Sequence, residues 1–331
     1  MPLHLGHESL INEGLRSSDT LTVLVCSIPN EPIDGNLRYA WVKQRFPSAN
    51  VIHVTDIVPQ TPREHPDFWG IWRRLIFHYH PEKIDAVFTS ERYGDKLSRV
   101  LDCKHVCIDR KRTTFAVSGT KIRRDPVRYW RFIAKPARPA FVKKVLIYGA
   151  ESTGKTTLAK RLARHYKTTW SPEYARAYIE EKLDDDLANL GVNDQVPIAF
   201  GHAALENEKL KDARIVHFTD TDAITTCIYF DHYFGYVDPR VLELSNHEKY
   251  DLILLTYPDV PWSVDRQRDL GHQREQMHSK FIDGLTSRGL EWVDIRGNWE
   301  NRWRLAKNAT DRILLKGNTN SPRVRANRSR R

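Results

Sequence analysis

Cysteines are few in this 331-residue chain, which has four of them scattered along its length: Cys26, Cys103, Cys107 and Cys227. That number and spacing exclude the dense disulfide framework of a small secreted protein and favour a reducing cytoplasm. The sequence also lacks any apolar run close to the ~20 residues that span a bilayer, and its opening residues, MPLHLGHESL, lack the charged-then-apolar layout of a signal peptide. We therefore expect a cytoplasmic protein with no membrane segment.

Acidic residues are absent from the last sixteen positions, and the net charge of +10 is concentrated there. Residues 316–331 hold six lysines and arginines, so the other 315 residues carry a net charge of only +4. Since this tail has almost no apolar content, we predict that it is disordered. It is either a solvated extension without a defined role or a segment that makes weak, salt-sensitive contacts with polyanions. The mildly basic body is what we expect of a protein that holds phosphates.

Short β-branched runs alternate with amphipathic helical stretches, which predicts an α/β fold with parallel sheets covered by helices. The predicted strands are 21–27, 51–56, 86–90, 105–109, 144–149, 214–219, 251–256 and 291–295, and the clearest helical patterns are 37–46, 67–80, 158–166 and 273–286. At roughly 150 residues per domain, the length predicts two domains. Two prolines in KPARP, at 135–139, interrupt the chain just before the fifth strand. We therefore expect one domain over 1–137, a second over 138–315, and the tail over 316–331.

The most specific motif is GAESTGKTT at residues 149–157, which matches the phosphate-loop pattern G-x-x-x-x-G-K-[ST]. It lies between a predicted buried strand and a predicted helix, an order that aims backbone N–H groups and the positive end of the helix at a phosphate. Lys155 would neutralise charge on the β- and γ-phosphates, and Thr156 would bind Mg²⁺. A glycine-rich turn without a ligand is the alternative. The residues that we predict to bind ATP are Gly149, Ser152, Thr153, Gly154, Lys155, Thr156 and Thr157.

Further residues of the second domain are typical of a kinase. Asp220 and Asp222 follow a predicted strand, and carboxylates at that end of a strand hold Mg²⁺ or accept a proton from an attacking hydroxyl, although they also cap helices. We assign Asp220 to catalysis and, with Thr156, to Mg²⁺, and Asp222 to substrate binding. Arg266 and Arg268 lie in a glycine-containing segment that either closes over the transferring phosphates or forms a solvated loop.

The first domain has two histidines, His4 and His7, on one face of the first turn of a predicted helix. Gly6 lets the backbone approach a ligand, and imidazole N–H groups suit the phosphates of a nucleotide. A zinc site is disfavoured because no third ligand lies nearby at a suitable spacing. A second predicted anion site, at the other end of the domain, consists of Ser118, Thr120 and Arg123. Two such sites in one α/β domain indicate a substrate with a polyphosphate chain.

Together these motifs resemble the NadR family, whose members combine a nicotinamide-mononucleotide adenylyltransferase with a ribosylnicotinamide kinase. The resemblance covers residue 4 to about residue 313. The segments that carry it are PLHLGH (2–7), FTSERYG (88–94), VSGTKIR (117–123), GAESTGKTT (149–157), PEYAR (172–176) and TDTDAITT (219–226). It implies a Rossmann-like nucleotidyltransferase domain of the HxGH type followed by a P-loop kinase domain.

The resemblance also implies two ATP-dependent steps of NAD salvage. In the second domain nicotinamide riboside would be phosphorylated at its 5′-hydroxyl. In the first, the phosphate of nicotinamide mononucleotide would attack the α-phosphorus of ATP and release pyrophosphate. By similarity His4, His7 and Arg123 would stabilise charge on the ATP phosphates, with Ser118 and Thr120 completing the site. Since nicotinamide is a pyridinium cation that favours aromatic faces and carboxylates, candidate substrate-binding residues are Trp72, Glu173 and Tyr174, unless these rings fill the core.

In nucleotidyltransferases of this type the HxGH motif follows the first strand of a parallel sheet, but here only three residues precede His4. We therefore expect the first domain to lack that strand and Met1 to be internal to a longer protein. A protein that did begin at Met1 would have a weakened first domain beside an intact kinase.

Two other functions stay open. One is a nucleotide-sensing transcriptional regulator with little turnover, although no helix-turn-helix is visible and DNA contact would fall to the basic tail. The other is a different nucleotidyltransferase fused to an unrelated kinase. A homo-oligomer is compatible with the sequence.

Overall fold

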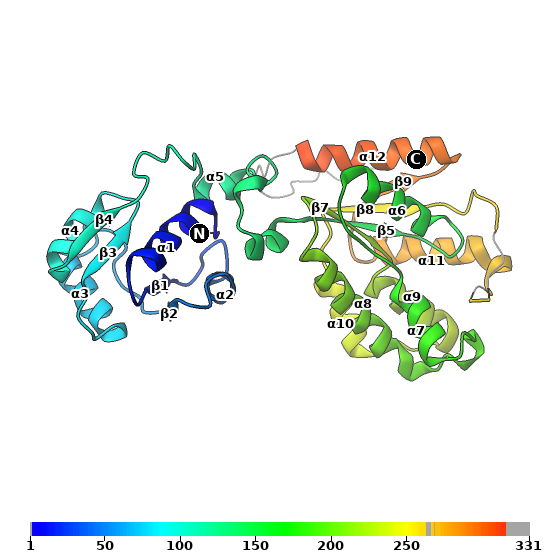
Figure 1. The fold of residues 1–331 in the computed structure, drawn as a ribbon. Coiled ribbons are helices and arrows are strands. Elements are labelled where there is room, and N and C mark those ends of the chain that lie inside the picture. The colour runs from blue at the N-terminus through cyan, green and yellow to red at the C-terminus, as the bar shows by residue number, and fades with distance from the viewer. Residues whose placement is uncertain (1, 263–265, 268, 316–331) are drawn as a thin grey trace. The chain divides into compact units, whose positions relative to one another are not determined.

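The computed structural model describes residues 2–262, 266–267 and 269–315. It divides into two compact units, the first ending at Arg138 and the second beginning at Pro139 (Figure 1). The mixed α/β class with parallel sheets is confirmed in both. The predicted basic tail and Arg268 lie outside the described residues. Within the described ranges, every helix is too short or too polar to cross a membrane.

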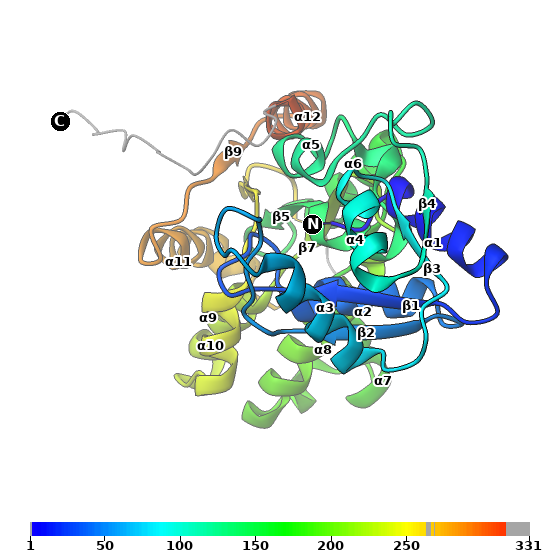
Figure 2. The same cartoon turned by 90° about the vertical axis from the view of Figure 1, so that its left-hand side faces the viewer.

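The first unit alternates helices with short parallel strands (Figure 2). Its elements are α1 (Leu5–Ser17), β1 (Thr22–Cys26), α2 (Gly35–Arg45), β2 (Asn50–Val54), α3 (Phe68–Tyr79), β3 (Ala86–Thr89), α4 (Tyr93–Leu101), β4 (Lys104–Cys107) and α5 (Gly119–Arg124), followed by a 3-10 turn at Trp130–Phe132. β1 pairs with β2 and β3 with β4, in two separate two-stranded sheets. From residue 2 onward no described strand precedes α1, and His4 forms only an isolated antiparallel bridge with Ile133. All four predicted strands of this unit are therefore present, but in a divided sheet.

The second unit contains one five-stranded parallel sheet in the order β6-β7-β5-β8-β9. Its main elements are β5 (Lys143–Tyr148), α6 (Lys155–Tyr166), β6 (Trp170–Ser171), α7 (Tyr174–Lys182), α8 (Gln195–Leu210), β7 (Val216–Asp220), α9 (Ala223–Phe234), α10 (Pro239–His247), β8 (Leu252–Thr256), α11 (Arg274–Thr286), β9 (Val293–Ile295) and α12 (Trp299–Leu315). Short 3-10 turns lie at Lys135–Phe141, Leu187–Asn189, Val192–Asp194 and Gly271–Gln273. The four predicted strands and the two predicted helices of this unit are confirmed. Of the strands, only β6, two residues long, was not predicted, and the helices α7, α8, α9, α10 and α12 are additional to the two named from the sequence.

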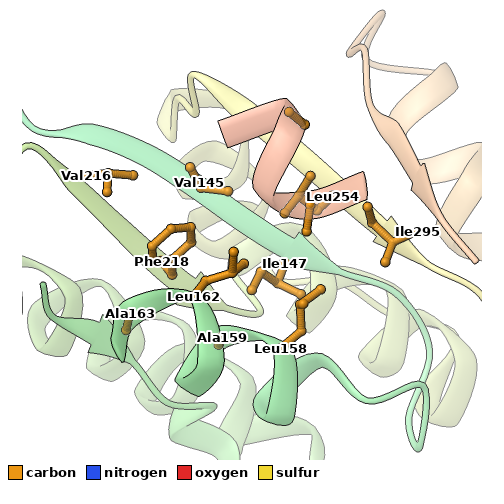
Figure 3. Packing of buried hydrophobic residues seen from close by; sticks show 12 residues of the cluster. Val145, Ile147, Leu158, Ala159, Leu162, Ala163, Val216, Phe218, Leu254 and Ile295 are labelled. Atoms are coloured by element: carbon orange, nitrogen blue, oxygen red, sulfur yellow. The ribbon is translucent and has the colours of Figure 1, made fainter. Parts of the chain in front are cut away.

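β5 lies in the middle of this sheet because its side chains are apolar on both faces. Val145 and Ile147 pack with residues of α6 and α12, a core that Figure 3 shows from close by. Leu146 and Tyr148 face the other way and pack with residues of α9 and α11. The alternation of side chains along a strand thus places one layer of helices on each face of β5. The loop that leaves β5 is thereby held at the carboxyl edge of the sheet.

We expect that changing Leu162 to alanine destabilises the second unit by about 3 kcal/mol, because a fully buried leucine leaves a cavity when it is truncated. Unfolding in urea, followed by far-UV circular dichroism, measures this loss. The matched control is Leu242→Ala, since Leu242 is 43% exposed and its truncation should change stability by no more than ~0.5 kcal/mol. Equal losses of stability in the two variants would contradict the burial of Leu162 in the core of the second unit.

Candidate functional site

The phosphate-loop motif leaves β5 and leads directly into α6, the position that the sequence predicted. Gly149 has φ +141° and Gly154, the N-cap of α6, has φ +84°. Glycine is required at both because side chains rarely tolerate these angles. The Thr153 hydroxyl donates a hydrogen bond to the Ala150 carbonyl at 2.7 Å and closes the loop on itself. The first amides of α6 therefore border a tight loop, which is the arrangement that binds phosphate in other proteins.

Lys155 and Thr156 occupy the first two positions of α6. The Lys155 ammonium is buried and donates to the Ala150 carbonyl at 3.0 Å. The Thr156 hydroxyl donates to Asp220 Oδ2, at the end of β7, at 2.5 Å. A hydroxyl and a carboxylate beside a phosphate loop are the oxygen ligands that Mg²⁺ prefers.

Asp220 is fully buried, and its Oδ1 has no hydrogen-bond partner among the described residues. Burial raises the pKa of Asp220 to about 6, although the nearby Lys155 ammonium opposes the shift. A buried carboxylate oxygen without a partner is costly, so this side chain is suited to a cation. In the described ranges no group of three or more His, Cys, Asp or Glu side chains could hold a metal, at this site or at any other.

A large pocket opens beside the loop. Its walls include loop residues 151–157, Glu173, Tyr174, Arg176, His202, Asp222, Tyr229, Phe230, Tyr233 and Gln267. The structure therefore brings Glu173, Tyr174 and Asp222, which we predicted to bind substrate, to the same pocket as the phosphate loop. Residues of the phosphate loop, aromatic rings and carboxylates all line this pocket.

The two carboxylates of this pocket have different surroundings. Glu173 forms an ion pair with Arg176, with Nε and Oε2 3.2 Å apart. Asp222 caps α9, where its Oδ1 accepts hydrogen bonds from the backbone N–H and the hydroxyl of Thr225 at 2.9 and 3.0 Å. Its Oδ2 is buried without a partner among the described residues, and burial raises the pKa of Asp222 to about 6. Asp222 therefore both caps α9 and lines the pocket.

Some pocket residues were not predicted. Tyr229 and Tyr233 lie four residues apart on one face of α9, a spacing that the sequence shows and that could have identified them. His202 is a single histidine in α8, 3% exposed, and nothing in the sequence around it indicates a site.

In the arginine-bearing segment before α11, the structure describes Arg266 and Gln267 but not Arg268. The Arg266 side chain is 87% exposed and lies 4.0 Å from Asp185, and it is not among the residues that line the pocket. Gln267 lines the pocket instead, and its amide donates to Asp185 Oδ1 at 2.5 Å. The described part of this segment therefore brings a glutamine to the pocket.

In the first unit His4 and His7 come together at the start of α1. Their rings are stacked, with centroids 3.8 Å apart, and His4 is the N-cap, whose Nδ1 accepts from the His7 N–H at 3.4 Å. Burial lowers the pKa of His4 to about 4 and that of His7 to about 3. Both rings are neutral near pH 7 in this state, so each offers one N–H donor, and a neighbouring phosphate would favour their charged forms. A Cβ on Gly6 would lie 3.0 Å from the His4 ring, so glycine leaves room for this stacking.

Ser118, Thr120 and Arg123 lie together on α5. Ser118 caps the helix by accepting a hydrogen bond from the Lys121 N–H at 3.3 Å, as the sequence predicted. The Arg123 guanidinium donates to the Thr120 hydroxyl at 3.4 Å. The three residues thus lie within about one and a half turns of this short helix.

Trp72 lines a second, smaller pocket in the first unit, at the carboxyl ends of β1 and β2. Two carboxylates, Glu31 and Asp56, line the same pocket. The Trp72 indole N–H donates to the Pro59 carbonyl at 2.9 Å, which fixes the ring. An aromatic ring with carboxylates nearby is the environment predicted for a pyridinium cation. The His4–His7 pair is not among the residues that line this pocket.

A protein-family model described as an AAA domain matches residues 144–302 of the chain. The trifunctional NAD biosynthesis/regulator protein NadR of Escherichia coli (strain K12) is 31% identical over 313 residues, which cover 89% of this chain and 76% of that protein. The protein of the same name from Salmonella typhimurium is 30% identical over 314 residues, with the same coverage.

Two solved structures share the fold of the whole described chain. A crystal structure of NadR in complex with NR has a TM-score of 0.78 at 24% identity and covers 95% of this chain and 93% of its own. One of NadR with NAD and AMP-PNP has a TM-score of 0.78 at 22% identity and covers 98% and 96%. Because the sequence match to the two bacterial proteins extends along nearly nine-tenths of the sequence, the chain belongs to the NadR family.

Proposed function

We propose that the chain catalyses two steps of NAD salvage, the phosphorylation of nicotinamide riboside and the adenylylation of the resulting mononucleotide. The observation that carries this proposal is the large pocket, where a phosphate loop meets aromatic and acidic residues and where the Thr156 hydroxyl, which lines the pocket, donates to the buried carboxylate of Asp220. The names of the bacterial relatives, and the NR, NAD and AMP-PNP complexes of the solved NadR structures, support the same reading.

In the kinase step the loop amides and Lys155 would hold the β- and γ-phosphates of ATP. Thr156 and Asp220 would hold Mg²⁺, which supplies charge neutralisation on the phosphates when bound. The 5′-hydroxyl oxygen of the riboside bonds to the γ-phosphorus as the bridging oxygen leaves with ADP. Its proton passes to a carboxylate, for which the candidates are Glu173, which lines the pocket, and Asp220, whose Oδ2 accepts from the Thr156 hydroxyl.

The acceptor would occupy the same pocket. Tyr174, Tyr229 and Tyr233 line it, and aromatic faces attract a pyridinium cation. The carboxylates of Glu173 and Asp222 add attraction for the same positive charge. The substrate assignments of Glu173, Tyr174 and Asp222 thus have a common physical basis.

In the adenylyl-transfer step the first unit would use His4 and His7 to donate hydrogen bonds to the ATP phosphates. Ser118, Thr120 and Arg123 would complete that site, and Trp72 would stack on the nicotinamide ring. A phosphate oxygen of the mononucleotide bonds to the α-phosphorus, and pyrophosphate leaves. Positioning and charge stabilisation suffice for this step, so no covalent intermediate is needed.

The deciding experiment incubates the purified chain with ATP, Mg²⁺ and nicotinamide riboside and follows both products by chromatography. We expect nicotinamide mononucleotide to accumulate first and NAD to follow. If mononucleotide alone accumulated, the second step would be wrong for this chain. If neither product formed while nucleotides still bound, the result would favour a sensing role without turnover.

Changing His7 to asparagine should lower the rate of NAD formation from the mononucleotide about 100-fold, because the shorter amide no longer places an N–H where the ring stabilises developing charge and cannot become positively charged. Riboside phosphorylation should not change, because the phosphate loop belongs to the other unit. A coupled assay for NAD and a separate assay for ADP measure the two steps. The matched control is His65→Asn, an exposed histidine of the same unit. Equal NAD formation in both variants would contradict the role of His7.

A further inference from the structure

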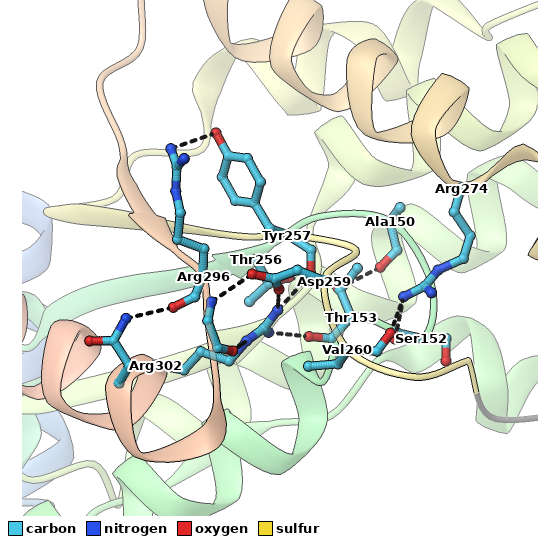
Figure 4. A network of polar contacts seen from close by, with 12 residues as sticks. Ala150, Ser152, Thr153, Thr256, Tyr257, Asp259, Val260, Arg274, Arg296 and Arg302 are labelled. Atoms are coloured by element: carbon cyan, nitrogen blue, oxygen red, sulfur yellow. Dashed lines mark hydrogen bonds and ion pairs between the residues drawn. The ribbon is translucent and has the colours of Figure 1, made fainter.

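Arg302, on α12, is the largest of the fully buried side chains, with 1% of its surface exposed. Its guanidinium donates to the carbonyls of Thr153 and Tyr257, both at 2.7 Å, and to that of Gly297 at 2.9 Å. It also forms an ion pair with Asp259 (Figure 4). A buried guanidinium is tolerated only when its donors are satisfied in this way.

Arg302 does not line the large pocket, yet one of its contacts is with the phosphate loop itself. In a trans peptide the C=O and the following N–H point in opposite directions. Holding the Thr153 carbonyl toward Arg302 therefore turns the Gly154 N–H away from Arg302. The orientation of that donor, at the start of α6, is set from outside the pocket.

A second arginine acts on the preceding peptide. Arg274, at the start of α11, donates to the carbonyl of Ser152 at 3.2 Å and to that of Val260 at 3.0 Å. Figure 4 shows Arg274 and Arg302 reaching this loop from α11 and from α12. Two consecutive loop carbonyls are thus each held by a guanidinium.

α12 also contacts the loop through Trp299. A Cβ built on Gly154 would lie 2.4 Å from a ring carbon of Trp299, so the ring lies directly against this glycine. The loop is therefore packed by a ring and hydrogen-bonded by an arginine that both come from the last described helix.

We propose that Arg302 is a positioning residue for nucleotide binding, which presets the phosphate loop before ATP arrives. Its partner Asp259 keeps the guanidinium in place, and the second oxygen of that carboxylate accepts the Gly297 N–H at 2.6 Å. A preset loop does not have to reorganise its peptides when phosphates bind, and this lowers the cost of binding. The inference rests on the proposed function only in that the loop binds ATP.

The test compares Arg302→Lys, which keeps the charge but loses the planar fork, with Asp259→Asn, which keeps the arginine but removes its ion pair. We expect the Kd for Mg-ADP and the KM for ATP to rise about tenfold in Arg302→Lys, as expected for the loss of a hydrogen bond to a charged group. The rise in Asp259→Asn should be smaller. The KM for nicotinamide riboside should stay within about twofold of the unchanged chain, because Arg302 does not line the pocket.

Hydrogen exchange of the ligand-free chain separates positioning from general stability. We expect faster exchange of amides in the peptides that cover residues 150–156, with the sheet strands unchanged. The matched control is Arg304→Lys, an exposed arginine on the same helix, which should leave both readouts unchanged.

Equal loosening of the sheet and the loop, or equal rises in KM for ATP and for the riboside, would overturn the proposal. If Arg302→Lys does not fold, Asp259→Asn decides by the same two criteria. Binding of Mg-ADP by the unchanged chain without any action on the riboside would instead contradict the proposed function and leave this test valid.

Discussion

Replacing Lys155 by alanine is expected to lower kcat/KM for riboside phosphorylation about 1000-fold, the upper range for removing one preorganised charge-stabilising group. Lys155 is buried at the first position of α6, and its ammonium already lies inside the loop, on the Ala150 carbonyl. The charge that it supplies there cannot be replaced by water. Steady-state assays of ADP release, with ATP and riboside varied in turn, measure the loss.

The matched control for this variant is Lys160→Ala, because Lys160 is an exposed lysine on the same helix, near the ring of Trp170. It should change the rate less than about twofold. Adenylyl transfer by the first unit should be unaffected in both variants. If Lys155→Ala phosphorylated the riboside at the unchanged rate, the loop would not be the ATP site and the kinase proposal would be wrong.

Changing Asp220 to asparagine should lower kinase activity about 100-fold or more while it raises the stability of the second unit. The activity falls because a neutral amide is a poor ligand for Mg²⁺. Stability rises because burial holds the pKa of Asp220 at about 6, so the ionised side chain opposes folding near neutral pH. If Asp220 were only a structural residue, its replacement would instead lower both the kinase activity and the stability of the second unit.

The size of the stability gain in Asp220→Asn depends on pH. The pKa of Asp220 is raised in the folded protein, so the protonated form is the one that folding favours. Its contribution to stability is complete below the unfolded pKa of about 4 and is lost as pH rises through the folded value. Without Mg²⁺, the gain from Asp220→Asn should therefore be largest near about pH 8 and should vanish near about pH 4.

Urea unfolding at the two pH values, with ADP-release assays alongside, checks both parts. The matched control is Asp231→Asn, because Asp231 lies on the surface of α9 and pairs with Lys280. It should alter neither the activity nor the pH dependence. Full activity in Asp220→Asn would contradict the assignment of this carboxylate to the reaction.

The sequence predicted those parts of the protein that are formed by residues close together in the chain. The phosphate loop is a local structure, since its glycines, its lysine and the apolar strand before it are consecutive in the sequence. The caps formed by Ser118 and Asp222 are local for the same reason, whereas the cap formed by His4 was not predicted. β6 was missed because two residues are too few to show a strand period.

Contacts between distant segments were not predictable in this way. In the sequence Arg302 is one of several charged residues of a polar helix. Only the structure shows that it donates a hydrogen bond to the Thr153 carbonyl. His202 likewise has no local pattern, and it lines the pocket because α8 packs beside α9. Tyr229 and Tyr233 are an intermediate case, because their spacing was visible but their pocket was not.

The hydrogen bond between Arg302 and Thr153 joins residues that are 149 positions apart. During translation the loop, complete in sequence, therefore leaves the ribosome long before the helix that orients it has been made. A nascent chain that stalls before residue 302 carries the whole nucleotide-binding motif without its support. On the proposed role of Arg302, the loop of a growing chain is therefore held in its binding conformation only after residue 302 has been made and α12 has packed against it.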